Sequence, residues 1–114
     1  MARRKPHLTV VTSLAATDEL FEIWLFNLKR HNFDHAESYE AFLKSGINEL
    51  ATEYEEGDKV EGFPELRRMA LRRSRQGDGH VVIYEIDPLA QSVYIHHLYH
   101  TKMDIQGRLE SEFK

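Results

Sequence analysis

Side chains that can move a proton gather near the end of the chain. Within the five positions from 96 to 100 stand His96, His97, Tyr99 and His100. Upstream arginines, among them Arg68, Arg72 and Arg73, carry guanidinium groups that can clamp a phosphate. Metal-free cleavage of RNA needs such groups, because a general base, a general acid and cations must act around one phosphorus atom. If the protein is a nuclease of this kind, the expected catalytic residues are His97, Tyr99, His100 and Arg72.

The residues around these histidines predict a strand over 93–99. Strand alternation places His96 and His100 on one face with Leu98. It places His97 and Tyr99 on the opposite face. No aspartate or glutamate stands between positions 88 and 103, and the chain contains no cysteine. The sequence therefore predicts no metal site and no cofactor, and it excludes a disulfide framework and a cysteine nucleophile.

Basic residues are concentrated in one short segment. The whole chain of 114 residues has 15 Lys and Arg against 19 Asp and Glu, a net charge of −4, which argues against a protein that lives on bulk nucleic acid. Five arginines nevertheless fall within the nine positions from 67 to 75: Arg67, Arg68, Arg72, Arg73 and Arg75. The cluster indicates either a basic strip for an acidic partner or a strand that balances acidic helices in its own fold.

The period of the apolar residues predicts the elements that position these side chains. Strands are predicted over 8–12, 66–74, 80–86 and 93–99, and helices over 17–30 and 34–54. The segment 57–64 is predicted to be a loop, 101–114 a tail or a short helix, and 1–6 a flexible tail. Residues 1–114 thus form one α+β domain. It has an N-terminal strand, an antiparallel αα-hairpin and a three-stranded antiparallel meander in one curved sheet, with the hairpin on one face.

The first predicted helix has more apolar residues than one buried face requires. Thr17 is its expected N-cap, and Asp34 is the expected N-cap of the second helix. Phe21, Trp24 and Phe26 are expected in the core, with the remaining apolar surface forming a groove for a partner. No apolar segment approaches the ~20 residues of a membrane span, so a soluble, cytoplasmic protein is expected.

Three patches of the sequence, taken in order, resemble the ParE/RelE superfamily of small toxins, and its ParE branch most closely. Residues 18–24 read D-E-L-F-E-I-W, similar to the family's opening D-L-x-x-I-W. Residues 79–87 read G-H-V-V-I-Y-E-I-D, similar to G-S-H-V-I-F-Y-R-I-D. Residues 98–104 read L-Y-H-T-K-M-D and resemble L-H-G-R-M-D, with Thr101 in place of the usual glycine.

The resemblance implies a function and a set of partners. A ParE-like protein is the toxin of a type II toxin–antitoxin system, inhibits DNA gyrase by binding it, and is neutralised in a hetero-oligomeric complex by a cognate antitoxin. That antitoxin is expected to be acidic, ParD-like and DNA-binding. The RelE branch implies instead a ribosome-dependent mRNA endonuclease, and a third reading is a non-toxic relic that only binds its partner. The negative net charge disfavours docking on ribosomal RNA, so a binding inhibitor without catalytic residues is expected.

The residues expected to contact the antitoxin or the target come from three places. The arginine cluster offers a basic strip, and the first helix offers its tryptophan. His100 and Asp104 match the family's terminal pattern. The expected set is Arg67, Arg68, Arg72, Arg73, Arg75, Trp24, His100 and Asp104.

Overall fold

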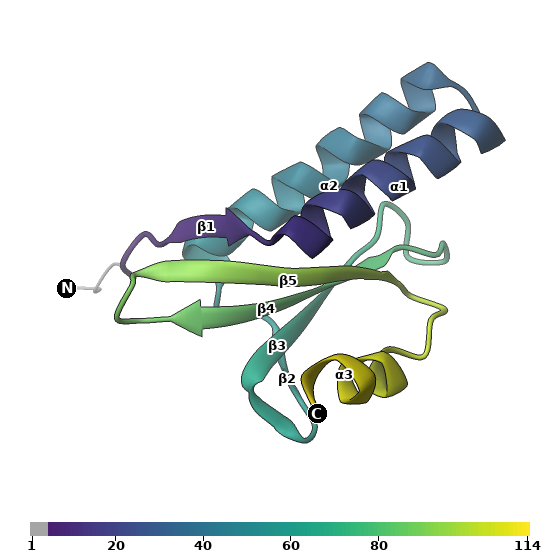
Figure 1. Ribbon diagram of the computed structural model, residues 1–114. Helices are drawn as coiled ribbons and strands as arrows, with labels where there is room; N and C mark the ends of the chain where they lie inside the picture. The colour runs from purple at the N-terminus through teal and green to yellow at the C-terminus, as the bar shows by residue number, and fades with distance from the viewer. Residues whose placement is uncertain (1–4) are drawn as a thin grey trace.

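The computed structural model describes residues 5–114, which form three helices and one five-stranded sheet (Figure 1). The strands are β1 (Thr9–Thr12), β2 (Asp58–Val60), β3 (Phe63–Leu71), β4 (His80–Asp87) and β5 (Ser92–His100), and the helices are α1 (Leu14–Arg30), α2 (Phe33–Glu53) and α3 (Ile105–Phe113). The strand order is β1-β5-β4-β3-β2. Strand β1 is parallel to β5, and the other neighbours are antiparallel. The predicted α+β class, with its αα-hairpin and antiparallel meander, is confirmed.

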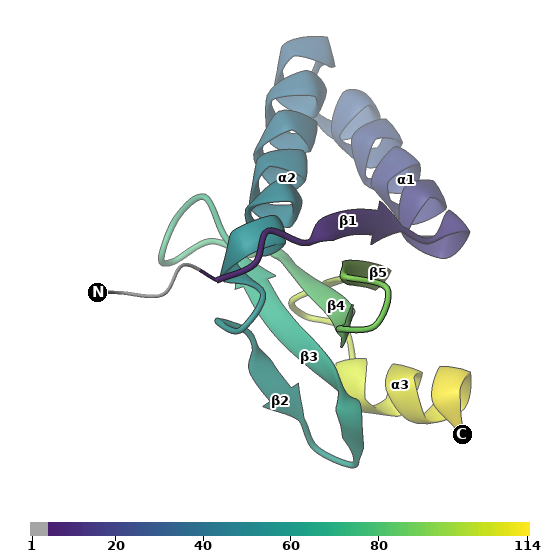
Figure 2. The same ribbon diagram turned by 90° about the vertical axis from the view of Figure 1, so that its left-hand side faces the viewer.

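Helices cover both faces of the sheet (Figures 1 and 2). The α1–α2 hairpin packs on one face, where Leu43 of α2 shares a buried cluster with Val82 of β4. Helix α3 packs on the other face, where Leu109 shares a second buried cluster with Ile83. We call these the hairpin face and the α3 face. The sequence predicted the hairpin on one face of the sheet. For the segment 101–114 it predicted either a tail or a short helix, and the structure shows the helix α3.

Strand β4 lies at the centre of the sheet and is buried on both faces. Its residues Val81, Val82, Ile83 and Tyr84 are each at most 3% exposed. A strand covered on both sides has no need of polar alternation, which explains the unbroken apolar run at these positions. The strongest strand signal in the sequence therefore marks the middle of the domain.

A β-bulge in β5 changes which histidines share a face. Ile83 pairs with His97 and Tyr84 with Ile95, so His96 is an extra residue in β5. An extra residue shifts the alternation by one position. The predicted grouping of His96 with Leu98 and His100 is therefore wrong, because the bulge places His96 on the α3 face beside Phe113, with ring centroids 5.1 Å apart.

Both long helices begin at caps other than the predicted ones. Ser13, and not Thr17, is the N-cap of α1, and Asn32, and not Asp34, is the N-cap of α2. In each case the side-chain oxygen accepts the N–H of the third helical residue, at 2.9 Å for Ser13 and 2.8 Å for Asn32. Helix α1 therefore begins three residues earlier than the sequence predicted.

The predicted loop 57–64 contains a short strand. Strand β2 pairs with β3, and Gly62 turns the chain between them with a φ of +82°, which glycine adopts without steric strain. Burial of Val60 and Phe63 in the cluster of the α3 face holds this ribbon against the domain. Strand β3 consequently begins at position 63 and ends at 71, so Arg72 and Arg73 lie outside it.

The start of the described chain contacts the end of α2. Of the predicted tail 1–6, residues 1–4 lie outside the described part, whereas the carbonyl of Pro6 accepts a hydrogen bond from the Tyr54 hydroxyl at 3.1 Å. Within residues 5–114, no helix has the length and apolar character needed to cross a membrane.

The hydroxyl of Tyr84 joins the sheet to the end of α2. It donates to the Tyr54 carbonyl at 2.8 Å and accepts the Gly57 N–H at 3.0 Å. A Cβ at position 57 would lie 2.2 Å from this hydroxyl oxygen, so only glycine fits there. Burial raises the pKa of Tyr84, which keeps the hydroxyl protonated and able to donate.

Replacing Tyr84 by phenylalanine should destabilise the domain by about 1–3 kcal/mol, because two buried backbone groups lose their hydrogen-bond partner. Urea unfolding followed by circular dichroism measures the change. Tyr94→Phe is the matched control, since Tyr94 is 37% exposed and should lose less than about 0.5 kcal/mol. Equal losses in the two variants would contradict the structural role of this hydroxyl.

Candidate functional site

A cleft of about 660 Å³ opens beside α1, where β4 begins and β5 ends. Ile23 and Phe26 of α1 form part of one wall, and His80 and His100 lie on the sheet side. The connection between β3 and β4, residues 72–79, and Arg108 of α3 complete the rim. The cleft therefore joins the predicted terminal histidine to part of the arginine cluster.

His80 is held inside the cleft by a tyrosine of α2. Its Nδ1 lies 2.7 Å from the Tyr39 hydroxyl. Burial, and then the neighbouring His100, lower the pKa of His80 to about 4. Burial raises the pKa of Tyr39 against the opposing effect of Arg73. Both members of the pair are therefore uncharged at neutral pH, far from the pKa near the working pH that suits a general acid or base.

The side chain of His100 makes its contacts at the end of β5, where the residue itself lies. Its Nδ1 accepts the backbone N–H of Lys102 at 3.1 Å, and its ring meets His80 edge-on with centroids 5.3 Å apart. The next residue is tied across the sheet, because the Thr101 N–H donates to the Gly79 carbonyl at 3.0 Å. His100 thus helps to turn the chain from β5 towards α3, and it also borders the cleft.

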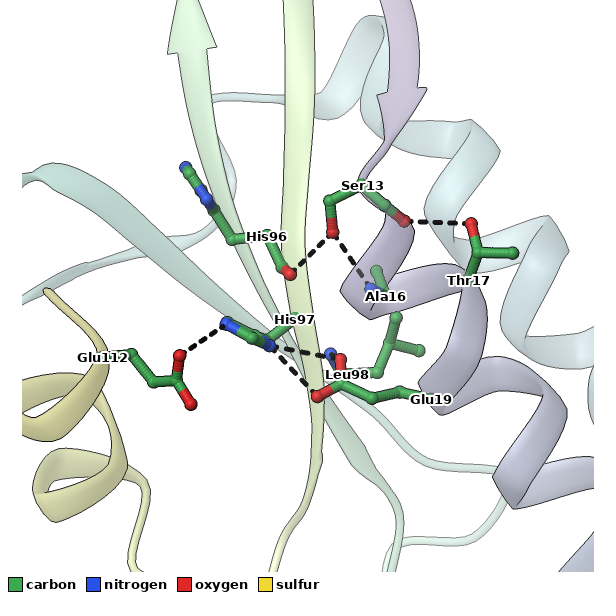
Figure 3. A network of polar contacts seen from close by, with 8 residues as sticks. All are labelled: Ser13, Ala16, Thr17, Glu19, His96, His97, Leu98 and Glu112. Carbon is green, nitrogen blue, oxygen red and sulfur yellow. Dashed lines mark hydrogen bonds and ion pairs between the residues drawn. The ribbon is translucent and has the colours of Figure 1, made fainter.

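His97 lies between two carboxylates and joins α1 to α3 (Figure 3). Its Nδ1 is 3.0 Å from Glu19 of α1, and its Nε2 is 4.0 Å from Glu112 of α3. The same Glu19 also accepts the backbone N–H of Leu98 at 2.9 Å. With its side chain only 12% exposed, His97 links the layers of the fold, and Glu19 occupies its Nδ1.

Tyr99 is buried on the α3 face. Its ring stacks on His97 with centroids 4.9 Å apart, and its hydroxyl has no hydrogen-bond partner among the described residues. Burial, then Glu19 and Glu112, raise the pKa of Tyr99 to about 12. A phenol with so high a pKa is a poor proton donor or acceptor at neutral pH.

The four residues named for RNA cleavage do not converge on one point. His97 and Tyr99 lie on the α3 face, whereas His100 pairs with His80 on the hairpin face, and of the four only Tyr99 and His100 line the cleft. Arg72 lies in the 72–79 connection and donates to the Gly77 carbonyl at 3.2 Å. General acid–base chemistry requires all its groups within reach of one reacting atom, and this arrangement does not place them so.

The five clustered arginines do not form one strip. Arg67 is on the hairpin face, where it donates to the carbonyls of Glu55 and Gly57 at 3.2 and 3.0 Å. Arg68 is opposite Ile83 on the α3 face. The three others are exposed in the 72–79 connection: Arg72, Arg73 and Arg75. We call these three residues the arginine loop.

Arg73 fixes the arginine loop against α2. Its guanidinium carbon lies 6.0 Å from the ring centroid of Tyr39 and 5.8 Å from that of Phe42, within the range of cation–π attraction. One of its nitrogens also donates to Ser38 at 2.5 Å. The loop is therefore anchored through one arginine, which also lines the cleft, while Arg72 and Arg75 are exposed in the same loop.

The remaining predicted site residues differ in what they do. Asp104 is the N-cap of α3 and accepts the Gly107 N–H at 3.1 Å, a structural task. Trp24 is half-buried, and its Nε1 donates to Glu37 at 2.7 Å. Phe21 and Phe26, expected in the core, are 58% and 62% exposed. That expectation was wrong because the hairpin buries one side of α1, through Ala16, Leu20 and Asn27.

Sequence reasoning missed three residues that shape this region: Glu19, Tyr39 and His80. A tyrosine within the apolar stripe of α2 was a usable signal, because a buried hydroxyl needs a partner. Glu19 gave no such signal, since acids near a helix start are common for reasons of the helix dipole alone. Among residues 5–114, no group of three histidines or acids is arranged to hold a metal ion.

The chain is similar to one protein family and to solved structures of two toxin–antitoxin proteins. A family model described as "ParE toxin of type II toxin-antitoxin system, parDE" matches residues 10–105. The chromosomal ParDE system of P. aeruginosa is a similar solved structure, with a TM-score of 0.70 at 11% identity over 86% of this chain and 100% of that chain. E. coli RelE, solved in the free state as an arginine double mutant, has a TM-score of 0.61 at 14% identity over 90% of this chain and 92% of that chain. No curated protein sequence matches this one.

The two kinds of comparison support different conclusions. At identities of 11% and 14% the likeness to solved structures concerns the fold, which the ParE and RelE branches share. The family model extends from the second residue of β1 to the first residue of α3 and includes the arginine loop and every residue lining the cleft except Arg108. This chain belongs to the ParE toxin family of type II toxin–antitoxin systems.

Proposed function

We propose that this protein is a toxin that inhibits DNA gyrase by binding it, and that a cognate antitoxin neutralises it. Membership of the ParE family supplies the class of protein. The observation that supports this mode of action is that the four residues named for RNA cleavage are scattered: Tyr99 and His100 line the cleft from opposite faces of β5, whereas His97 and Arg72 do not line it. A protein whose acid–base groups are not gathered around one point acts, in this proposal, by occupying its target, in the cytoplasm where gyrase works.

The antitoxin surface in this proposal is the arginine loop. Arg72 and Arg75 are exposed in the loop, and Arg73 holds the loop in place through α2. An acidic, ParD-like segment that is disordered when free would gain charge-assisted hydrogen bonds here. In this proposal the DNA-binding part of the antitoxin lies outside this contact. Toxin and antitoxin together form a hetero-oligomer.

The RelE-like alternative, an mRNA endonuclease, rests on the shared fold and on the exposed position of the arginine loop. It requires His100 to act on a ribosome-bound message, and ribosomal RNA favours a basic partner. The third possibility, a relic that binds an antitoxin without harming the cell, predicts no growth arrest at all. The three functions therefore separate in a single expression experiment.

Replacing His100 by glutamine should leave toxicity within a few fold if the protein is a binding inhibitor. Loss of a general acid or base would lower a cleavage rate by about 10²–10⁴-fold. Growth arrest, plasmid supercoiling and mRNA primer extension are measured on the same culture, with the melting temperature as the test of folding. A folded His100→Gln variant that loses growth arrest and mRNA cleavage together would establish the RelE-like function instead.

Neutralising the arginine loop should slow capture by the antitoxin. The double variant Arg72→Gln, Arg75→Gln is expected to lower the association rate about 3- to 10-fold at low salt and to flatten its salt dependence, because long-range attraction is screened. Stopped-flow or surface-based kinetics over a salt series provides the measurement.

Lys29→Gln with Arg30→Gln is the matched control for this pair, since it removes the same two charges from the exposed end of α1. The control should associate at nearly the rate of the unmodified protein. Identical kinetics for all three proteins would remove the arginine loop from the antitoxin interface.

A further inference from the structure

The outward side of α1 carries a row of apolar side chains that the core does not use. Helical spacing of three, four and seven places them side by side. With one phenylalanine of α2 they form a surface that we call the α1 stripe: Leu14, Phe21, Trp24, Leu25, Leu28 and Phe33. Leu14, Phe21 and Phe33 are 86%, 58% and 57% exposed, and none of the six belongs to the buried cluster under the hairpin.

The aromatic part of the α1 stripe is already ordered. Phe21 stacks on Trp24 with ring centroids 6.2 Å apart, and Phe33 meets Trp24 edge-on at 6.3 Å. The bond from the Trp24 Nε1 to Glu37 fixes the indole ring. A partner that binds here loses little free energy to the ordering of these side chains.

The hairpin extends past the sheet, so the far half of the α1 stripe has no sheet behind it (Figures 1 and 2). The buried residues of α1 end with Asn27, and the side chains that follow pack only within the hairpin or face solvent. Rigid exposed aromatics beside a charged rim are typical of protein interfaces.

Acidic residues border the α1 stripe. Between positions 14 and 53 the hairpin has eight Asp and Glu against three Lys and Arg, so its charge is 3 − 8 = −5. Asp18 and Glu22 flank the exposed start of the stripe on α1, while Asp34 and Glu37 flank it on α2. A second copy of this chain would bring equal negative charges together, whereas a partner with cationic flanks would be attracted.

We propose that the α1 stripe is the docking site of an amphipathic helix of another protein, whose apolar face is bordered by lysine or arginine. An apolar helix face fits a fixed aromatic row, and its cations pair with the carboxylates of Asp18, Glu22 and Glu37. The arginine loop lies on the α2 side of the hairpin in Figure 2, and it borders the cleft, which no residue of the α1 stripe lines. The protein can therefore hold a basic helix on α1 while an acidic segment occupies the loop.

Trp24 makes the test direct, because it is the only tryptophan in the chain and lies within the α1 stripe. Two synthetic tryptophan-free helical peptides are titrated into the full-length protein. They share one leucine face and differ in flanks of lysine or glutamate. The lysine peptide should give a saturable change in Trp24 emission that weakens with salt, and the glutamate peptide should bind at least 10-fold more weakly.

Two serine substitutions on the same helix locate the binding. Phe21→Ser removes a ring from the α1 stripe and should lower the affinity for the lysine peptide at least 10-fold. Phe26→Ser is the matched control, because Phe26 is about as exposed as Phe21 but faces the cleft. The affinity of this variant for the lysine peptide should stay within two-fold of that of the unmodified protein. Circular dichroism and melting temperature establish that both variants fold.

Four outcomes would overturn the proposal. They are no binding of the lysine peptide, equal binding of both peptides, equal effects of the two serine variants, and concentration-dependent self-association in sedimentation that Phe21→Ser abolishes. The last would assign the stripe to a second copy of the chain. None of these results bears on gyrase inhibition or antitoxin kinetics, so the proposal and the proposed function fail separately.

Discussion

The backbone groups at the free edge of β5 are the constraint from which the rest of the arrangement follows. Strand β1 covers this edge only as far as Ile95. Beyond it, the Ser13 hydroxyl donates to the His96 carbonyl at 2.8 Å, and Glu19 accepts the Leu98 N–H. Both partners come from the beginning of α1. Because the backbone N–H and C=O groups of β5 beyond Ile95 need hydrogen-bond partners, the helix starts against the edge of this strand. Helix α1 then leaves the sheet, which opens the cleft on one side and exposes apolar residues on the other.

The negative net charge is an average over two unlike surfaces. The hairpin is acidic, and the arginine loop contributes three cations at the opposite side of α2. Arg73 connects the two regions by packing on Tyr39 and Phe42. Charges of opposite sign on different parts of one small domain let it attract partners of opposite character.

The sequence was sufficient for most of the fold and for little of the site. Periodicity identified both helices of the hairpin and the strands β4 and β5, because burial acts on every residue of a regular element. It failed at His96, where one inserted residue reverses the alternation, and at Ser13, which caps α1 through the Ala16 N–H four positions before the predicted cap Thr17. It also placed Phe21 and Phe26 in the core, because apolar composition does not reveal which side of a helix finds a partner.

The parallel pairing of β1 with β5 also sets when this chain can fold. The two strands are neighbours in space, but nearly the whole domain separates them in sequence. Val93, Ile95 and Leu98 of β5 belong to the cluster that the hairpin covers. Contacts of such long range must close a large loop and slow folding. During synthesis the hairpin therefore leaves the ribosome well before the strand it packs on, and its apolar face stays without that partner until β5 has emerged.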